Sequence, residues 1–290
     1  MIARAGIWLG TLVEVALPEA DATEARFAAA FASIAHVHRK MTVHDPASDL
    51  ARIARDAHRR TIVVDAQTHA VLELALVLSR ETQGAFDPTA ARPPSRDGGA
   101  SPSIERSGST SGFAASIILE RGNRVRTTAP VALDLGGIAT GHAVDRAVAV
   151  LIESGARGGV VNAGGDLRAF GSAGWIPIRV RHPADAARAA HLFDVRDIAV
   201  ATSADYFHSY GTLLDPGTGT LRPFGASVTV VAPTCALADA LTKVVAVDPA
   251  RAPETLARHG AHALLLERRA ASVRATTTCA RSTSRLRFAA

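Results

Sequence analysis

The stretch LDLGGIATGHAVD, residues 133–145, decides how this chain is interpreted. An apolar segment that we predict to be a strand meets two glycines, and a helical pattern carrying Asp145 and Arg146 follows. Glycines let a ligand approach the backbone closely, and the free N–H groups at a helix start attract anions. Taken alone, the stretch fits a structural strand-to-helix turn or a loop that binds an anion. It matches neither GxGxxG nor a P-loop.

Length and composition exclude several protein classes. The 290 residues, 48% of them hydrophobic, suffice for one large domain or two intimate lobes. No apolar run reaches the roughly 18 residues of a membrane span, and no signal peptide or lipid-attachment cysteine is visible, so we expect a cytoplasmic protein. A truncated exported form would look the same. Scattered arginines and an aromatic content of 4% argue against nucleic-acid binding.

Periodicity predicts an α+β fold, because strands and helices cluster without a steady βαβ rhythm. We expect strands at 7–17, 61–65, 114–120, 124–133, 159–163 and 262–267, short strands over 166–231, and helices at 18–41, 66–84, 140–154, 234–247 and 253–259. Within TVHDPASDLARIAR, residues 42–55, we expect Ser48 to cap a short helix that follows it. The Pro/Ser/Gly-rich stretch 90–112 predicts a flexible loop. We divide the chain into a compact domain over 1–270 and a basic, disordered tail over 271–290.

Three further turns carry an aspartate. VVNAGGD ends in Asp166, GAFDPTA contains Asp87 and LLDPGTG contains Asp215. An Asp before Pro is held extended, which presents its carboxylate or simply caps the turn. Each turn alone has an adequate structural explanation. Together they suggest carboxylates and bare backbone meeting in one cleft, a setting that suits Mg²⁺ bridging substrate phosphates.

The helix predicted at 234–247 carries Asp239 within an apolar run. A buried carboxylate is costly unless it is paired or bound to a metal. Lys243 follows four residues later, so an ion pair within the helix and a metal ligand are both open at this point. The two cysteines, Cys235 and Cys279, lie in no CxxC pair and are interpreted as a buried thiol and a tail thiol.

These motifs, in this order, resemble the FAD:protein FMN transferase family, also called the ApbE or thiamine-biosynthesis-lipoprotein family. The matching stretches are LGTLVEV, MTVHDPASDLARI, GAFDPT, DLGGIATGHAVD, VNAGGD, ATSADY, LLDPGTG and SVTVVAPTCALADALT, which span nearly the whole chain. The resemblance implies one compact α+β domain of two intimate lobes around one FAD-binding cleft. It further implies Mg²⁺-dependent transfer of FMN from FAD to a Thr or Ser hydroxyl of an acceptor flavoprotein, with release of AMP.

The resemblance also implies site residues. The positions expected to contact the flavin nucleotide are His44, Ala85, Phe86, Asp87, Asp134, Thr140 and Leu213. The expected metal ligands are the Gly137 carbonyl, the Asp239 carboxylate and the Thr242 hydroxyl. Asp239 and Thr212 are the expected catalytic positions. On this interpretation, the glycine turn holds the diphosphate and metal end of FAD.

The chain departs from the family pattern at four places. Lys243 stands where a metal-binding Thr or Asp is usual, and we expect it to pair with Asp239 or to supply part of the cation's charge. Thr212 replaces a common His, Gly217 replaces a usual Arg, and the segment after GAFDPT is unusually rich in Pro, Ser and Gly. Two alternative functions therefore stand beside the transferase. One is an FAD-binding protein without transfer activity, and the other is an FAD pyrophosphatase that yields free FMN and AMP.

Overall fold

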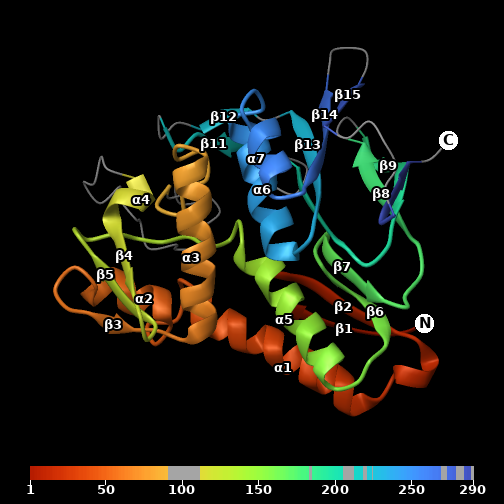
Figure 1. The fold of residues 1–290 in the computed structure, drawn as a ribbon, viewed down its shortest axis with the longest axis horizontal. Helices are drawn as coiled ribbons and strands as arrows, with labels where there is room; N and C mark the ends of the chain where they lie inside the picture. The colour runs from red at the N-terminus through yellow and green to blue at the C-terminus, as the bar shows by residue number, and fades with distance from the viewer. Residues whose placement is uncertain are drawn as a thin grey trace. The chain divides into compact units, whose positions relative to one another are not determined.

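The structure is a computed structural model that describes residues 1–90, 112–182, 185–204, 212–217, 221–223, 225–268, 273–278 and 284–288. Its internal contacts divide the chain into two units. Figure 1 shows the fold, coloured by residue number from red at the N-terminus to blue at the C-terminus. The first unit consists of Met1–Ala35, Thr140–Leu213 and Arg222–Ala290, and the second consists of His36–Ala139 and Leu214–Leu221. Helices and antiparallel sheets occur together, so the predicted α+β class is confirmed.

An eight-stranded antiparallel sheet forms the centre of the first unit, in the order β1-β2-β6-β7-β10-β13-β14-β15. Its interior strand β13 is buried at every residue, as a strand covered on both faces should be. The edge strand β1 is largely exposed. The strands run as β1 Ile2–Trp8, β2 Thr11–Leu17, β6 Gly158–Ala163, β7 Asp166–Gly171, β10 Ala199–Ala204, β13 Ala226–Ala232, β14 His262–Arg268 and β15 Val273–Thr277.

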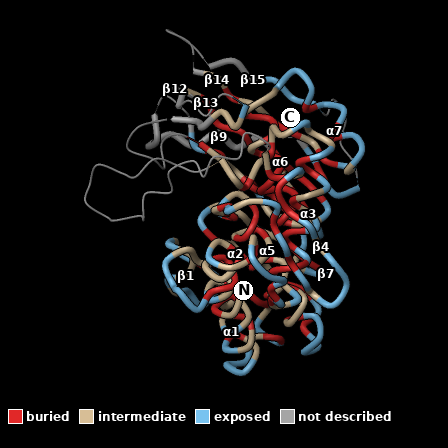
Figure 2. Tube along the Cα trace, turned by 90° about the vertical axis from the view of Figure 1, so that its left-hand side faces the viewer, coloured by how far each residue is buried: buried red, intermediate tan, exposed pale blue. Residues whose placement is uncertain are grey.

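One helix, α6 (Cys235–Val247), packs against four strands of this sheet, namely β7, β10, β13 and β14. It is apolar almost all round, and 11 of its 13 residues are buried (Figure 2). The shorter α7 (Ala252–Arg258) packs on α6 and β14. The remaining elements here are the 3₁₀ turn Glu19–Asp21, α1 (Glu24–Met41), which runs on into the second unit, and α5 (Ala139–Glu153), which starts one residue before the first unit resumes.

A three-stranded sheet, β16-β9-β8, completes the first unit. Its strands are β8 Ile176–His182, β9 Asp185–Val195 and β16 Leu286–Phe288. Ile178, Val180 and Phe193 pack in one apolar cluster with Val200 and Leu286. Two strands of the first unit come from residues 271–290, since β15 pairs with β14 and β16 pairs with β9.

The second unit holds the sheet β3-β5-β4 and three helices. Ser48 caps α2 by accepting from the Ala51 amide, as predicted from the sequence, and Asp65 caps α3 by accepting from the Gln67 amide. The bounds are α2 Asp49–Asp56, β3 Ile62–Val63, α3 Ala66–Glu81, α4 Gly112–Ser116, β4 Ile117–Glu120 and β5 Arg124–Thr127. The pair β11 (Thr212–Leu214) and β12 (Leu221–Pro223) forms a separate two-stranded sheet.

Two predicted strands are shorter than expected. Residues 112–116 form α4 before β4 begins, and β5 ends at Thr127. Val131, Leu133 and Leu135 are buried without belonging to a strand, because burial alone produces the apolar pattern that we interpreted as a strand. The predicted loop 90–112 falls almost wholly outside the described residues. Among those described, no helix is long and apolar enough to cross a bilayer.

Candidate functional site

The start of α6 is held by a carboxylate from α5. Asp145 accepts hydrogen bonds from the amides of Cys235 and Ala236, each at 2.9 Å, and the Arg168 guanidinium lies 2.6 Å from the same carboxylate. The two helices approach closely at Gly141, where a Cβ would lie 2.2 Å from the carbonyl oxygen of Cys235. The helix N-terminus of α6 is therefore satisfied by the protein itself, which fixes the position of the residues one turn further on.

One turn into α6, Asp239 is the centre of a buried polar cluster in the first unit. Its side chain is 2% exposed, and its Oδ1 lies 2.9 Å from the Lys243 ammonium. Lys243 Nζ also donates to Ser203 Oγ of β10 at 2.6 Å and to Thr242 Oγ1 at 3.0 Å. The Gly141 amide contacts Asp239 Oδ2 at a long 3.3 Å. The ion pair that the sequence left open is therefore confirmed.

A second carboxyl group, that of Asp166, acts on the same cluster from the first residue of β7. Burial raises the pKa of Asp166 well above its usual range, and the neighbouring Asp239 carboxylate raises it further, while the Lys243 ammonium opposes both. Two carboxyl groups and one ammonium are thus close enough to influence one another. Perturbed groups of this kind are typical of functional sites.

The thiol of Cys235 lies beside this cluster and is fully buried. Burial raises the pKa of Cys235, and the carboxylates of Asp145, Asp166 and Asp239 raise it further. A thiol that stays protonated is a poor nucleophile. The sequence interpretation of Cys235 as a buried thiol is confirmed, whereas Cys279 lies outside the described residues.

The oxygen donors predicted for Mg²⁺ do not fit that ion well. Asp239 and Thr242 lie together, since the Thr242 hydroxyl donates to the Asp239 carbonyl oxygen at 2.6 Å. However, the ammonium of Lys243 already occupies Asp239 Oδ1, and Mg²⁺ needs to sit about 2.1 Å from its ligands. In the described parts of the chain, no three His, Cys, Asp or Glu side chains gather as metal ligands. We therefore derive no step through a metal.

The second unit brings two predicted nucleotide-binding stretches together. The Asp134 amide donates to the Pro88 carbonyl at 2.8 Å, which joins the GAFDPT turn to the opening stretch. Asp87 accepts from the amide and hydroxyl of Thr89, at 2.7 and 2.6 Å, and from the Phe113 amide at 3.2 Å. Asp134 is exposed and accepts from the Gly136 amide at 2.8 Å. Both aspartates are thus positioned by their own turns.

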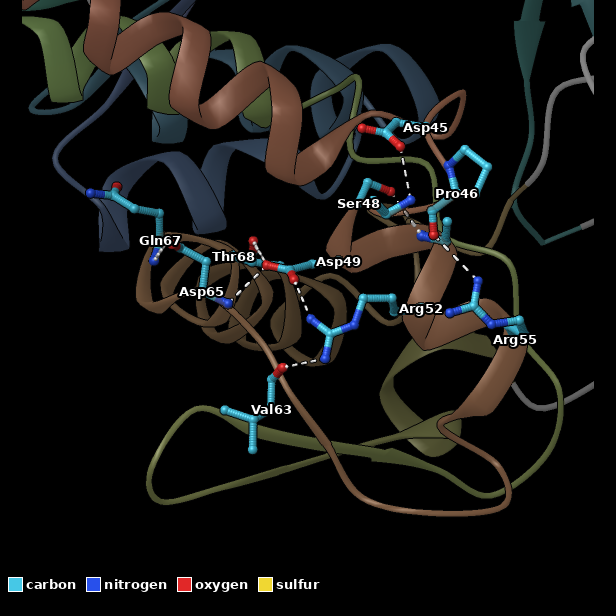
Figure 3. A network of polar contacts seen from close by, with 12 residues as sticks. Asp45, Pro46, Ser48, Asp49, Arg52, Arg55, Val63, Asp65, Gln67 and Thr68 are labelled. Carbon is cyan, nitrogen blue, oxygen red and sulfur yellow. Dashed lines mark hydrogen bonds and ion pairs between the residues drawn. The ribbon is translucent and has the colours of Figure 1, made fainter.

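The loop before α2 also belongs to a predicted motif. Figure 3 shows the polar contacts that connect this loop and α2 to the start of α3. Asp49 is 1% exposed and binds the Arg52 guanidinium at 3.0 Å, the Asp65 amide at 2.8 Å and the Thr68 hydroxyl at 2.9 Å. This network ties α2 to the start of α3. His44, the predicted ligand-contacting residue of this loop, is exposed, and its amide donates to Thr42 Oγ1.

The structure places the remaining predicted residues as follows. Thr140 lies in the first turn of α5. It directly precedes Gly141, whose amide contacts Asp239. Thr212 and Leu213 belong to β11, and the Asp-Pro turn that follows is formed as predicted, with Asp215 accepting from the Gly217 amide. Ala85 and Phe86 precede Asp87, and Phe86 is buried. Gly137 belongs to the second unit, as does Asp134.

Two members of the Asp239 cluster, Ser203 and Asp166, were not predicted to act on Asp239. Ser203 lies in the ATSADY stretch, and Asp166 was singled out only as one of the turn aspartates. The order of the motifs was the one sequence feature that could have pointed to these two residues. Only the pairing of β10 with β7 and the packing of α6 on both strands show that these side chains act on Asp239 and Lys243. The tight turn predicted at AGGD is confirmed, because Gly164 and Gly165 have positive φ between β6 and β7.

Comparison with known proteins agrees with this architecture. The ApbE family model matches residues 9–265. The ApbE protein of Thermotoga maritima is 28% identical, with a TM-score of 0.77, over 91% of this chain and 93% of that one. The flavin transferase ApbE of Vibrio cholerae is 22% identical, with a TM-score of 0.78, over 95% and 96% of the two chains. The flavinyl transferase ApbE of Pseudomonas stutzeri is 21% identical, with a TM-score of 0.78, over 95% and 94%. No curated protein matches the sequence.

Proposed function

The chain belongs to the ApbE family, and from this premise we propose that it transfers FMN from FAD to a Thr or Ser hydroxyl of an acceptor protein and releases AMP. Two solved structures of the same fold are flavin or flavinyl transferases, which supports this proposal. The observation that carries it is the Asp239 cluster. The buried Asp239 carboxylate interacts with a second carboxyl group, that of Asp166, and with the partly exposed Lys243 ammonium, and this costs more stability than packing a helix on a sheet requires.

The proposed reaction is a phosphoryl-group transfer. The acceptor oxygen forms a bond to the phosphorus of the FMN half of FAD, and the bond from that phosphorus to the bridging oxygen breaks. AMP leaves with the electron pair, and the acceptor hydroxyl loses its proton. Such reactions need positioning and charge compensation more than covalent help from the protein. We assign Asp239 to the charge balance at the diphosphate and Thr212 to the acceptor side, at the position where the family commonly has a His.

The flavin nucleotide is proposed to contact His44, Ala85, Phe86, Asp87, Asp134, Thr140 and Leu213. The best support comes from the second unit, where the Asp134 amide and the Pro88 carbonyl hold two of the motifs together. Both Asp87 and Asp134 accept hydrogen bonds within their own turns, so the protein's own hydrogen bonds hold the backbone of these loops. A preformed loop loses less entropy when it binds.

The family resemblance also predicts Mg²⁺, ligated by Gly137, Asp239 and Thr242. A bound Mg²⁺ would neutralise diphosphate oxygens. We leave it out of the proposed reaction because Lys243 occupies the Asp239 oxygen that the ion needs. The acceptor flavoprotein is identified only by its chemistry, a reachable Thr or Ser hydroxyl. A cytoplasmic location stays a prediction from the sequence.

Intact mass spectrometry tests the proposed function. The protein is incubated with FAD and an acceptor fragment that carries a flavinylation-type Thr, and small products are separated by liquid chromatography. We expect the acceptor to gain the mass of FMN less water, with one AMP released for each acceptor modified. Free FMN and AMP with an unmodified acceptor would indicate a pyrophosphatase. Bound FAD with no product would indicate a binding protein, and either result would overturn the transferase.

A further inference from the structure

We propose that the Lys243 ammonium takes the place of a metal cation in the Asp239 cluster, so that this chain binds the diphosphate of FAD without a divalent metal. The inference rests on the proposed function for the identity of the ligand. The claim that Lys243 is the cation is independent of the proposed function. It depends only on how Asp239, Lys243, Thr242 and Ser203 are arranged.

The ammonium is surrounded by oxygen atoms. An ammonium group has N–H donors only, and the contacts of Lys243 Nζ include three oxygens, those of Ser203 at 2.6 Å, Asp239 at 2.9 Å and Thr242 at 3.0 Å. One carboxylate and two hydroxyl oxygens are the kind of donor set that a hard cation takes. In this chain the Lys243 ammonium binds these oxygens instead of a metal ion.

The charge of Asp239 needs compensation. Asp239 is 2% exposed, so an ionised carboxylate there needs a positive partner. With Lys243 beside it, Asp239 repels a diphosphate less than it would alone. A divalent ion placed at the same carboxylate would lie against the ammonium, and that repulsion is strong at such short range.

The ammonium can contact an anion without leaving a hydroxyl unpaired. Ser203 Oγ lies 2.8 Å from Thr242 Oγ1 as well as 2.6 Å from Lys243 Nζ. If a phosphate oxygen replaced Ser203 at the ammonium, Ser203 would keep its bond to Thr242. The Lys243 side chain is also one-third exposed, whereas that of Asp239 is almost fully buried. A ligand coming from solvent is therefore expected to meet the cation before the carboxylate.

Metal binding is measured directly, with Mn²⁺ as the probe and its electron paramagnetic resonance signal as the readout. We expect no Mn²⁺ site at α6 in the wild-type chain and one bound equivalent in Lys243→Thr, which frees Asp239 and adds a hydroxyl. The double variant Lys243→Thr/Asp239→Asn should lose that equivalent. A wild-type site that disappears in Asp239→Asn would overturn the inference, as would a Lys243→Thr variant that gains no site.

FAD binding is measured separately by flavin fluorescence in EDTA and in MgCl₂. The wild-type Kd should agree within about twofold between the two buffers, whereas Lys243→Thr should bind at least about tenfold more weakly in EDTA and recover in MgCl₂. Lys243→Arg keeps the charge and should stay independent of metal. A wild-type Kd that tightens about tenfold with Mg²⁺ would contradict the proposal.

The matched control is Lys40→Thr, which removes the other lysine of the chain. It should behave as wild type in both assays, and circular dichroism of every variant confirms folding. The outcomes separate the two proposals. Metal-independent FAD binding without transfer would refute the transferase and keep the inference. If FAD does not bind at all, the Mn²⁺ titrations still decide whether Lys243 excludes the metal.

Discussion

Two buried aspartates, Asp49 in the second unit and Asp239 in the first, look alike in sequence and differ in their surroundings. Each pairs with a cation on its own helix, Arg52 three residues on or Lys243 four residues on. Asp49 has three donors at 2.8–3.0 Å, one of them a backbone amide. Asp239 has one short bond, to Lys243, and one long 3.3 Å bond, to the Gly141 amide, and it interacts with a second carboxyl group.

The difference separates a structural carboxylate from a functional one. Asp49 is satisfied by groups that link α2 to α3, so its bonds serve packing (Figure 3). Asp239 is bonded to the Lys243 ammonium, whose partner Ser203 could be exchanged for a ligand oxygen. A buried charge that is only partly satisfied costs stability, and natural proteins accept that cost mainly at functional sites.

The largest expected effect is on transfer. Asp239→Asn should lower the rate of FMN transfer about 10³-fold, equivalent to about 4 kcal/mol of transition-state stabilisation, because the Asn amide no longer holds the Lys243 ammonium in position through the 2.9 Å charged bond. Asp49→Asn is the matched control at equal burial and should keep transfer, per folded molecule, within about twofold. Initial rates from mass spectrometry measure both. Equal losses in the two variants would remove the distinction between the aspartates.

The next effect is on stability. Asp49→Ala should lower the free energy of unfolding by about 3 kcal/mol, since it leaves Arg52, the Asp65 amide and Thr68 without their partner. Urea unfolding measures the loss. The control is Glu254→Ala, which breaks the exposed pair with Arg258 and should cost about 0.5 kcal/mol or less. A loss for Asp49→Ala as small as this control would show that its network contributes little.

A smaller effect tests the contact that holds Asp239 in place. Gly141→Ala places a Cβ 2.2 Å from the Cys235 carbonyl, so α5 and α6 must separate. We expect a loss of about 2 kcal/mol, because overpacking typically costs 1–3 kcal/mol. Gly136→Ala is the control, since its Cβ would meet only the Asp134 carboxylate, at 3.0 Å. Thermal unfolding compares them, and a Gly141→Ala variant as stable as Gly136→Ala would show that the helices can move apart freely.

The smallest effect concerns the Cys235 thiol. Its raised pKa keeps it protonated, so alkylation by iodoacetamide at pH 8 should be at least about 100-fold slower in the folded chain than in guanidinium chloride. Because the folded pKa is raised, the stability linked to this group is complete below its ordinary value of 9.0 and falls as the pH rises through the folded value. Peptide mass mapping separates Cys235 from Cys279. Rapid labelling in the folded chain would contradict the burial.

The sequence alone determined much of the fold. Helical periodicity predicted the bounds of α1, α3, α5 and α6 to within a few residues at most ends. The apolar face of a helix depends only on the spacing of nearby residues, so the sequence shows it directly. Ser48 as a cap and Gly164–Gly165 as a hairpin turn were also predicted, since each depends on the chemistry of one or two residues. The apolar segment 131–133 was interpreted wrongly as part of a strand, because a buried segment without a strand partner has the same pattern.

Tertiary structure decided the site. The sequence placed Asp239 and Lys243 one turn apart and left an ion pair and a metal site both open. Which of the two occurs depends on Ser203 and Asp166, 36 and 73 residues away in sequence, which the β7–β10 pairing brings under α6. Periodicity and turn chemistry are local properties, so a sequence reveals them directly. The charge balance around a buried carboxylate is set by groups that only chain folding brings together.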